Sequence, residues 1–327
     1  MIEASGLSFQ GAMVGKRVAI VLVNYNGFSD TAACLNSLMQ LTSDVQLSLI
    51  LVDNASKDAS KLEGLKDECQ NLHIIYNQQN VGFGRANNIG IRWAQEHLNF
   101  DYLCLLNNDT IVEPDFLRHL IEPFAQDSQI GMTTGKIYYE HNRNMVWYGG
   151  ADINFRKGWP KVADYNGEAT ANGANRPRYV NFVSGCLMLF SKESISTLNG
   201  FDEQFFMYCE DLELCIRVKQ AGYKLFYAPS SIIYHKVHGS KTVEETGLRP
   251  RNPNLAFLYS NMKQNQFVTF RKHLKGLPFL MFFLIFNLQL LYITSRLLFR
   301  GRIDIMPEYF KVINGITRIS KLHTSRK

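Results

Sequence analysis

Two adjacent acids, Glu210 and Asp211, stand in the segment whose composition most favours chemistry. Residues 200–217 read GFDEQFFMYCEDLELCIR and hold five carboxylates within a dozen residues of four aromatic side chains. A carboxylate within hydrogen-bond reach of a hydroxyl group accepts its proton, and partial desolvation raises the carboxylate pKa toward useful base strength. The start of a helix lowers the same pKa. The pair therefore suits either proton transfer or, as the alternative, the capping of a helix.

Helical spacing follows this pair directly. Leu212, Cys215 and Ile216 recur at the interval of one helix face, and Gly222 is a natural stop. We therefore predict a helix whose first turn contains Glu210 and Asp211.

Polar side chains also follow three apolar runs at the point where each run ends. Asn24 follows residues 18–23, Asp53 follows residues 47–52, and Asn107-Asn108-Asp109 follows residues 102–106. Open α/β sheets place ligand clefts at the carboxyl ends of their strands. Any one of these residues could be an ordinary turn former, but the three coincidences together favour a site.

The elements that position these residues alternate between strands and helices. The apolar runs 18–23, 47–52, 72–76 and 102–106 are typical of strands buried on both faces. Between and after them we predict a helix capped by Ser29 or Asp30, a short helix at 59–65, a helix after 80–90, and one starting at Pro114. This pattern predicts an α/β fold with a mostly parallel sheet.

Familiar phosphate-binding loops are missing from the sequence. Gly82 and Gly84 do not complete GxGxxG, their segment does not follow the first strand, and no GxxxxGK[ST] occurs. Phosphate chemistry here would need a metal ion or basic side chains.

The composition indicates a globular chain with an uneven charge distribution. The 327 residues are 46% hydrophobic, which is ample for a core, and the six cysteines form no CxxC pair. We expect reduced, buried thiols in a cytosolic protein, without a zinc ribbon or a disulfide scaffold. The net charge of +6 belongs to the C-terminal region, because residues 271–327 hold 11 Lys or Arg against two acids.

That region contains the apolar run 277–299, flanked by basic residues on both sides. The run is marginal in length for a transmembrane helix, and the flanking charges suit a helix lying in an anionic membrane surface. The alternatives are a spanning helix or a buried helix in a dimer or domain interface. The apolar run 18–23 is shorter than the core of a secretory signal, so we expect the catalytic part to stay cytoplasmic.

Residues 138–179 form a long connection rich in Gly, Asn and Arg, with Trp147, Tyr148 and Trp159. Aromatic faces pack on sugar rings, so a loop that binds a saccharide is one interpretation. An ordinary surface excursion with a few buried aromatic residues is the other.

Seven segments, in matching order, resemble the inverting GT-A glycosyltransferases of family 2, and most of all the rhamnosyltransferase-like enzymes of bacterial surface polysaccharide assembly. The segments are VAIVLVNYNG (18–27), ILVDNASKD (50–58), NVGFGRANNIG (80–90), YLCLLNNDTIVEPDFL (102–117), GCLMLFSKE (185–193), GFDEQFFMYCEDLELCIRVKQAGYKL (200–225) and IIYHKVHGS (232–240). The resemblance covers roughly residues 17–270 and implies a GT-A fold, a Rossmann-like sheet flanked by helices.

The resemblance also implies roles for single residues. Asn24 and Tyr25 would contact the nucleotide, Asp53 would bind the base or ribose, and Arg85 and Asn88 would lie along the diphosphate.

Asn107-Asn108-Asp109 stands where the family has its DxD metal motif, with Asn107 and Asn108 on the nucleotide sugar and Asp109 as ligand of Mg²⁺ or Mn²⁺. The first acid of the motif is replaced by Asn107, whose amide oxygen still coordinates such ions but with less charge. His235 would complete the metal site, with His238 as a nearby competitor. Asp211 would be the catalytic base, and Glu210 would orient the acceptor or the loop.

By this resemblance the chain is expected to transfer rhamnose or another hexose from a nucleotide-diphosphate donor to a saccharide or lipid-linked saccharide. We predict a leader at 1–16, a GT-A domain at 17–245 and a basic helical region at 246–327 that attaches to the inner face of the membrane. A homodimer is possible and no nucleic-acid partner is expected. The alternatives are a sugar-nucleotide nucleotidylyltransferase and a catalytically silent membrane scaffold of the same fold.

Overall fold

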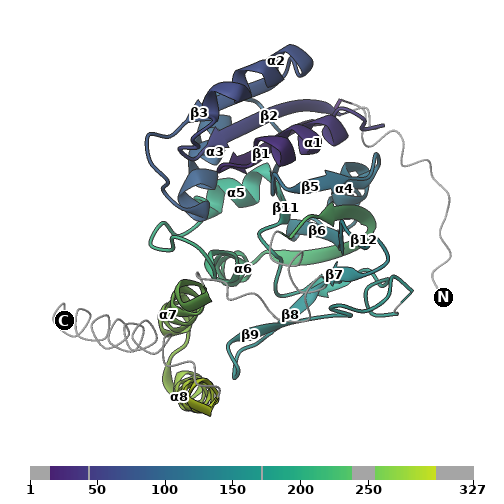
Figure 1. Cartoon of the computed structure of the whole chain (residues 1–327). Coiled ribbons are helices and arrows are strands. Elements are labelled where there is room, and N and C mark those ends of the chain that lie inside the picture. Colours follow the sequence, from purple (N-terminus) through teal and green to yellow (C-terminus); the bar gives the residue numbers. More distant parts are fainter. Residues whose placement is uncertain (1–14, 43–44, 171, 238–254, 300–327) are drawn as a thin grey trace.

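The computed structural model of the chain describes residues 15–42, 45–170, 172–237 and 255–299 (Figure 1). The predicted leader, apart from its last two residues, lies outside the described residues. So do His238, the predicted boundary at 245–246 and the basic tail beyond 299.

The four predicted strands form and are parallel to one another. They are β1 (Arg17–Asn24), β2 (Gln46–Asp53), β3 (Leu72–Tyr76) and β4 (Tyr102–Leu106), in the spatial order β4-β1-β2-β3. Their apolar side chains are buried, with Ala19, Ile20 and Leu51 at 0% exposure. The register pairs Asn24 with Asp53, so two of the predicted site residues end adjacent strands side by side.

The connections of this half form the three predicted helices, but the third begins at Phe83, inside the segment 80–90 that was expected to precede it. They are α1 (Phe28–Leu38), a 3₁₀ turn η2 (Ala59–Gly64) continued by α2 (Leu65–Glu68), and α3 (Phe83–His97). The predicted cap of α1 was wrong, because the helix already includes Ser29 and Asp30 and its N-cap is Gly27, with no side-chain cap hydrogen bond.

The second half of the sheet mixes directions. Strand β11 (Leu187–Ser191) lies antiparallel between β4 and β6 (Ile130–Tyr139), and β12 (Lys224–His235) runs parallel to β6. The short strands β5 (Thr110–Val112), β7 (Val146–Tyr148) and β10 (Arg178–Val180) pair with β12 or β6. Parallel ladders carry most of the paired positions, which confirms the α/β prediction. A separate hairpin joins β8 (Ala151–Asn154) and β9 (Trp159–Val162).

Three further helices belong to this half. They are α4 (Phe116–Gln126), which begins two residues after Pro114, α5 (Lys192–Leu198), which is capped by Ser191, and α6 (Glu210–Gln220). Helix α6 contains Glu210 and Asp211 in its first turn and ends before Gly222, whose φ is +89°, as predicted. All six cysteines are free and buried, which confirms that they form no disulfide scaffold.

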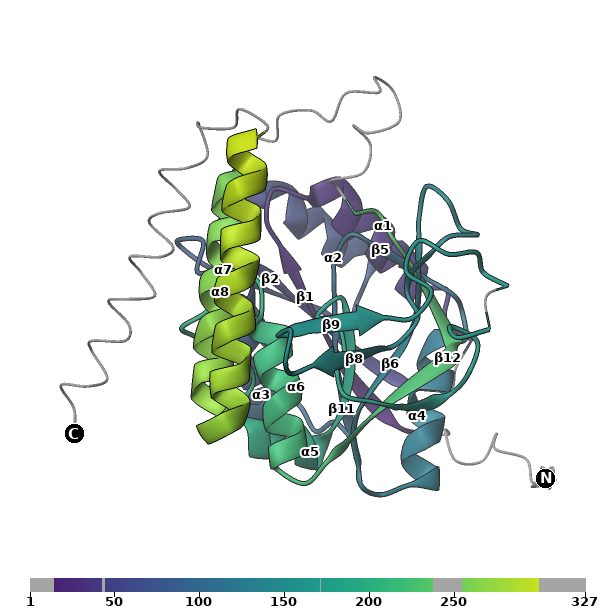
Figure 2. The same cartoon turned by 90° about the horizontal axis from the view of Figure 1, so that it is seen from below.

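The C-terminal region forms a pair of helices, α7 (Leu255–His273) and α8 (Gly276–Phe299), which lie side by side against the region of α6 (Figures 1 and 2). Phe270 stacks on Phe282 with ring centroids 4.6 Å apart, and Phe267 lies 5.5 Å from Phe286. Within the described residues, the stretch Gly276–Arg296 of α8 has the length and hydropathy of a membrane-crossing helix, judged on composition alone. Only 17% of its most apolar window is buried.

Candidate active site

The adjacent acids Glu210 and Asp211 begin helix α6 after an unusual turn. Tyr208 and Cys209, which precede them, both have left-handed backbone angles, with φ of 71° and 66°. Glu210 is 6% exposed, whereas Asp211 keeps part of its surface open. One carboxylate oxygen of Asp211 accepts the backbone N–H of Gly185 at 3.2 Å and the other accepts that of Leu212 at 2.8 Å.

Burial decides the protonation of this pair. Burial, and then the neighbouring charge of Asp211, raise the pKa of Glu210 to about 8. Burial also raises the pKa of Asp211, but the N–H groups of Gly185 and Leu212 offset part of that effect. Two neighbouring carboxyl groups with this burial do not both ionise readily, and near neutral pH Glu210 is the one that keeps its proton. For both carboxyl groups, burial therefore raises the pKa by more than the start of the helix lowers it.

Asp109 and His235, the two predicted metal ligands, are brought together by strand pairing. β5 runs antiparallel to β12 and aligns Thr110 with His235, so the residue just before β5 faces the last residue of β12. His235 Nε2 lies 3.1 Å from Asp109 Oδ1. The indole of Trp147 packs edge-on against the His235 ring at 4.7 Å. Within the described part of the chain, the buried Nδ1 of His235 has no hydrogen-bond partner.

A cavity of about 450 Å³ joins the two groups of residues. Its polar lining includes Asn107, His235, Glu210 and Asp211. Most of the remaining lining is aromatic or apolar: Phe83, Trp147, Tyr148, Val162, Tyr165, Phe182, Met207 and Tyr208. Trp147 and Tyr148 both belong to β7 and line this cavity, but Tyr148 is only 1% exposed and is part of the core, so the saccharide-binding interpretation of this connection stays a prediction. Trp159 does not line this cavity, and its ring lies 5.5 Å from the Lys263 ammonium.

The predicted nucleotide residues Asn24 and Asp53 lie at the ends of β1 and β2 and are 0% and 1% exposed. Asn24 donates to Asp53 at 2.8 Å and to Ser56 Oγ at 3.0 Å. Its side-chain oxygen, Oδ1, accepts hydrogen bonds from the Thr31 hydroxyl at 3.0 Å and from the Asn108 side-chain amide at 3.4 Å. The loops that follow β1, β2 and β4 are therefore joined to one another through the buried side-chain amide of Asn24. Tyr25, beside it, is 52% exposed.

Arg85 and Asn88, both on α3, form hydrogen bonds to residues 201–203, the segment before the turn that leads into α6. Asn88 accepts from the N–H of Phe201 at 2.7 Å and donates to its carbonyl at 2.9 Å. Arg85 donates to the Glu203 carbonyl at 3.1 Å and is 51% exposed. The contact of both residues with a diphosphate stays a prediction, and in this structure they support the approach to α6.

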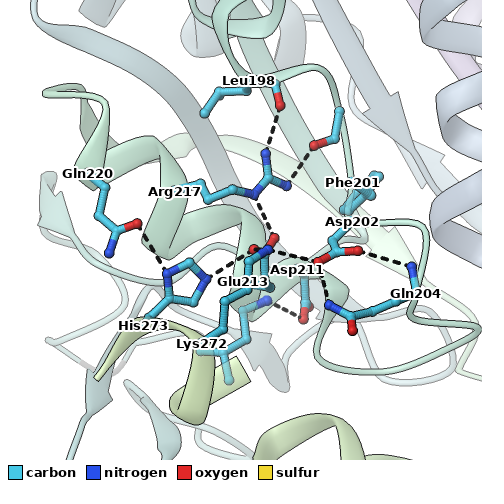
Figure 3. A network of polar contacts seen from close by, with 12 residues as sticks. Leu198, Phe201, Asp202, Gln204, Asp211, Glu213, Arg217, Gln220, Lys272 and His273 are labelled. Carbon is cyan, nitrogen blue, oxygen red and sulfur yellow. Dashed lines mark hydrogen bonds and ion pairs between the residues drawn. The ribbon is translucent and has the colours of Figure 1, made fainter. Parts of the chain in front are cut away.

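A buried acid, Glu213, was not predicted from the sequence. Its side chain is 0% exposed and contacts Arg217 at 2.7 Å, Lys272 at 2.6 Å and His273 at 3.0 Å (Figure 3). Burial alone would raise the pKa of Glu213, but the bonds and charges of these three partners lower it to about 2. Glu213 therefore ties α6, which carries the catalytic pair, to the end of α7. The available signal was an acid on the inner face of the predicted helix with Arg217 four residues later, whereas its other two partners are about 60 residues away.

Comparison with known proteins agrees with this geometry. Residues 19–198 match the family model described as glycosyl transferase family 2, and residues 170–239 match one described as the N-terminal domain of galactosyltransferase. Rhamnosyltransferase WbbL of Escherichia coli (strain K12) is 28% identical over 60% of this chain and 74% of its own length. The N-acetylglucosaminyl-diphospho-decaprenol L-rhamnosyltransferase of Mycobacterium tuberculosis is 27% identical over 68% of this chain and 76% of its own.

Two solved structures share the fold at lower identity. GalNAc-T7, solved with UDP, GalNAc and Mn²⁺, superposes with a TM-score of 0.54 at 18% identity, over 75% of this chain and 48% of its own. The mannosyltransferase PcManGT from Pyrobaculum calidifontis, solved with GDP-Man and Mn²⁺, gives 0.54 at 15% identity, over 95% of this chain and 80% of its own. None of these matches favours the nucleotidylyltransferase or the silent scaffold. The chain belongs to glycosyl transferase family 2 and is a rhamnosyltransferase-like, nucleotide-sugar glycosyltransferase of GT-A fold that acts in polysaccharide biosynthesis.

Proposed function

We propose that this enzyme transfers a hexose, with rhamnose as the first candidate, from a nucleotide diphosphate to a hydroxyl group of a lipid-linked saccharide with inversion. One observation carries the proposal: Asp211, His235 and Asn107 line a single cavity, and Asp109 contacts His235 at 3.1 Å. A proton acceptor and a candidate diphosphate site therefore face the same space. The names of the two rhamnosyltransferase relatives support the choice of sugar, and the second supports a lipid-linked acceptor.

Asp211 acts as the general base. Its carboxylate stays partly open to the cavity, and the N–H groups of Gly185 and Leu212 hold it in one orientation. The acceptor hydroxyl loses its proton to this group while its oxygen attacks the anomeric carbon from the face opposite the diphosphate. Glu210, protonated and buried beside it, places no second negative charge next to the base.

The donor set at Asp109 and His235 fits a divalent cation. A carboxylate and an imidazole lie within 3.1 Å of each other, and the Asn107 amide lines the same cavity. The described residues hold no cluster of three or more His, Cys, Asp or Glu, so oxygen atoms of the diphosphate would complete the coordination. A bound Mg²⁺ or Mn²⁺ would supply Lewis-acid stabilisation of the departing diphosphate. Tyr25 and Arg85, which are 52% and 51% exposed, would contact the nucleotide and its diphosphate, and Asn108 would contact the nucleotide sugar. The buried Asn24, Asp53 and Asn88 would hold the loops that form this site.

Trp147 and Tyr165 form the aromatic wall on which the acceptor sugar would pack, with the buried Tyr148 supporting it from the core. The exposed face of α8 is the site of membrane attachment: Leu284, Leu288 and Leu291 are 56%, 65% and 66% exposed, and Lys275 and Arg296 flank them. Such a helix lies in the surface of an anionic bilayer while its other face stays packed on α7. The enzyme would then work at the cytoplasmic face of the membrane.

In the decisive experiment, the full-length protein is incubated with labelled nucleotide-diphosphate sugars and with lipid-linked saccharides in vesicles. Parallel reactions contain Mn²⁺, Mg²⁺ or excess EDTA. We expect transfer from one donor, an inverted anomeric configuration, and loss of activity with EDTA. Full activity in EDTA would refute the metal site, and a retained configuration would refute Asp211 as a base acting in one displacement. Flotation of Leu284→Glu/Leu291→Glu with phosphatidylglycerol vesicles tests the attachment, which is refuted if this variant still floats with them.

A further inference from the structure

The turn that leads into the catalytic helix is held in a conformation that its own residues disfavour. Tyr208 and Cys209 are consecutive, are not glycine, and have φ of 71° and 66°. Each residue in this region costs roughly 1 kcal/mol or more, and such strain persists only where the surrounding structure fixes it. The angles of these two residues set the direction in which α6 starts, and with it the position of Asp211.

Every backbone carbonyl from residue 206 to residue 209 accepts a hydrogen bond. Phe206 O accepts the N–H of Phe83 at 2.9 Å, and Cys209 O accepts the helical N–H of Glu213 at 2.9 Å. The two carbonyls between them, those of Met207 and Tyr208, are both bound by one side chain of α7. The amide Nδ2 of Asn265 donates to each of them at 2.9 Å.

Helix α7, which carries this amide, is itself fixed on both sides of Asn265. Gln266 donates to the Gly158 carbonyl of the β8–β9 hairpin at 2.7 Å, and the buried Lys263 donates to Gln266 at 2.9 Å and to Gln289 of α8 at 3.1 Å. At the other end Lys272 binds the buried Glu213 of α6 at 2.6 Å (Figure 3). The amide of Asn265 therefore reaches the turn from a rigid support.

We propose that Asn265 is a positioning residue for the transfer reaction, which holds the Met207–Cys209 turn so that the Asp211 carboxylate faces the acceptor. The α7–α8 pair is then part of the catalytic unit as well as the proposed membrane attachment. The inference rests on the proposed role of Asp211 as base. It concerns a side chain that touches neither the cavity nor the reacting atoms.

The test compares Asn265→Asp and Asn265→Ala with Asn99→Ala as the matched control. Asp has the size of Asn but presents an acceptor where two carbonyls need a donor. Asn99 is an exposed residue just beyond the end of α3 whose side chain accepts a hydrogen bond from Lys192 at 3.3 Å, and it neither lines the cavity nor lies on α7 or α8. The measurements are kcat at saturating donor and acceptor, the Kd of the nucleotide sugar, the Tm, and amide hydrogen exchange over residues 205–212.

We expect kcat to fall about tenfold for Asn265→Ala and up to about a hundredfold for Asn265→Asp, because small misplacements of a catalytic group have effects of this size. The Kd should stay within about twofold and exchange should rise only in the turn. Asn99→Ala should match the wild type. A kcat within about twofold of the wild type for both Asn265 variants would overturn the proposal. A parallel loss of kcat, donor affinity and Tm, with exchange rising throughout the chain, would overturn it as well.

Assaying Asp211→Asn in the same series separates the failure of the base assignment from the failure of the positioning role. If Asp211→Asn transfers sugar normally, the base assignment fails, and the positioning role fails with it. If Asp211→Asn is inactive and the Asn265 variants are normal, only the positioning role fails.

Discussion

Replacing Glu213 by Gln should weaken the junction between the catalytic helix and the C-terminal helices. The side chain is 0% exposed and is surrounded by Arg217, Lys272 and His273 (Figure 3). The change removes the negative charge and leaves its basic partners in place, which is the costly way to break a buried ion pair. The pKa of Glu213 lies at about 2 against an ordinary 4.5, so about 2.5 pKa units correspond to about 3 kcal/mol of stability.

The sign of the pH dependence follows from the lowered pKa. The unfolded chain binds a proton at Glu213 before the folded chain does, so the stabilisation is fully present above about pH 4.5 and is lost as pH falls toward 2. The wild type should therefore exceed Glu213→Gln by about 3 kcal/mol at pH 7, and by about half as much at pH 3.

Urea unfolding of both proteins between pH 3 and pH 7 measures this difference. Glu63→Gln is the matched control, because Glu63 pairs with Lys66 at 2.8 Å on the surface and is 53% exposed. Exposed pairs of this kind contribute about 1 kcal/mol or less. A difference between wild type and Glu213→Gln that does not change with pH, or that is no larger than the control, would refute the reasoning.

Three further changes test the site. Asp211→Asn should lower kcat by about 10² to 10⁴ with unchanged binding of the nucleotide sugar, and normal turnover would remove Asp211 from the mechanism. Glu210→Gln should gain stability relative to the wild type as pH rises from about 4.5 to about 8, because burial raises the folded pKa of Glu210 and its ionisation opposes folding. Thermal unfolding measures this, and Tm values of variant and wild type that change in parallel with pH would contradict it. Gly82→Ala should lower the unfolding free energy by roughly 1–3 kcal/mol and lower kcat, because its φ is +86° and a methyl group would meet the Phe206 carbonyl. Gly64→Ala, where a methyl group would enter open space, should not. Equal unfolding free energies for the two variants would show that the fit at Gly82 is not tight.

The parallel half of the sheet could be predicted from the sequence because its signals are local. Apolar runs buried on both faces mark β1 to β4, and the Asn and Asp residues that follow mark their carboxyl ends. The helix at Glu210 was equally clear from its spacing and from Gly222. The antiparallel partners β5, β7 and β10 are three residues long, too short to give a period, and their existence depends on the strands they pair with.

The candidate site divides in the same way. The polar residues at the strand ends and at the start of α6 could be located from the chain alone, since turn chemistry and helical periodicity are properties of neighbouring residues. Tertiary packing is what brings Asp109 to His235, through the pairing of β5 with β12, and what buries Glu210 so that it keeps its proton. It alone placed Asn265 and Lys272 against α6, because contacts between residues about 60 positions apart depend on how helices pack and leave no local pattern.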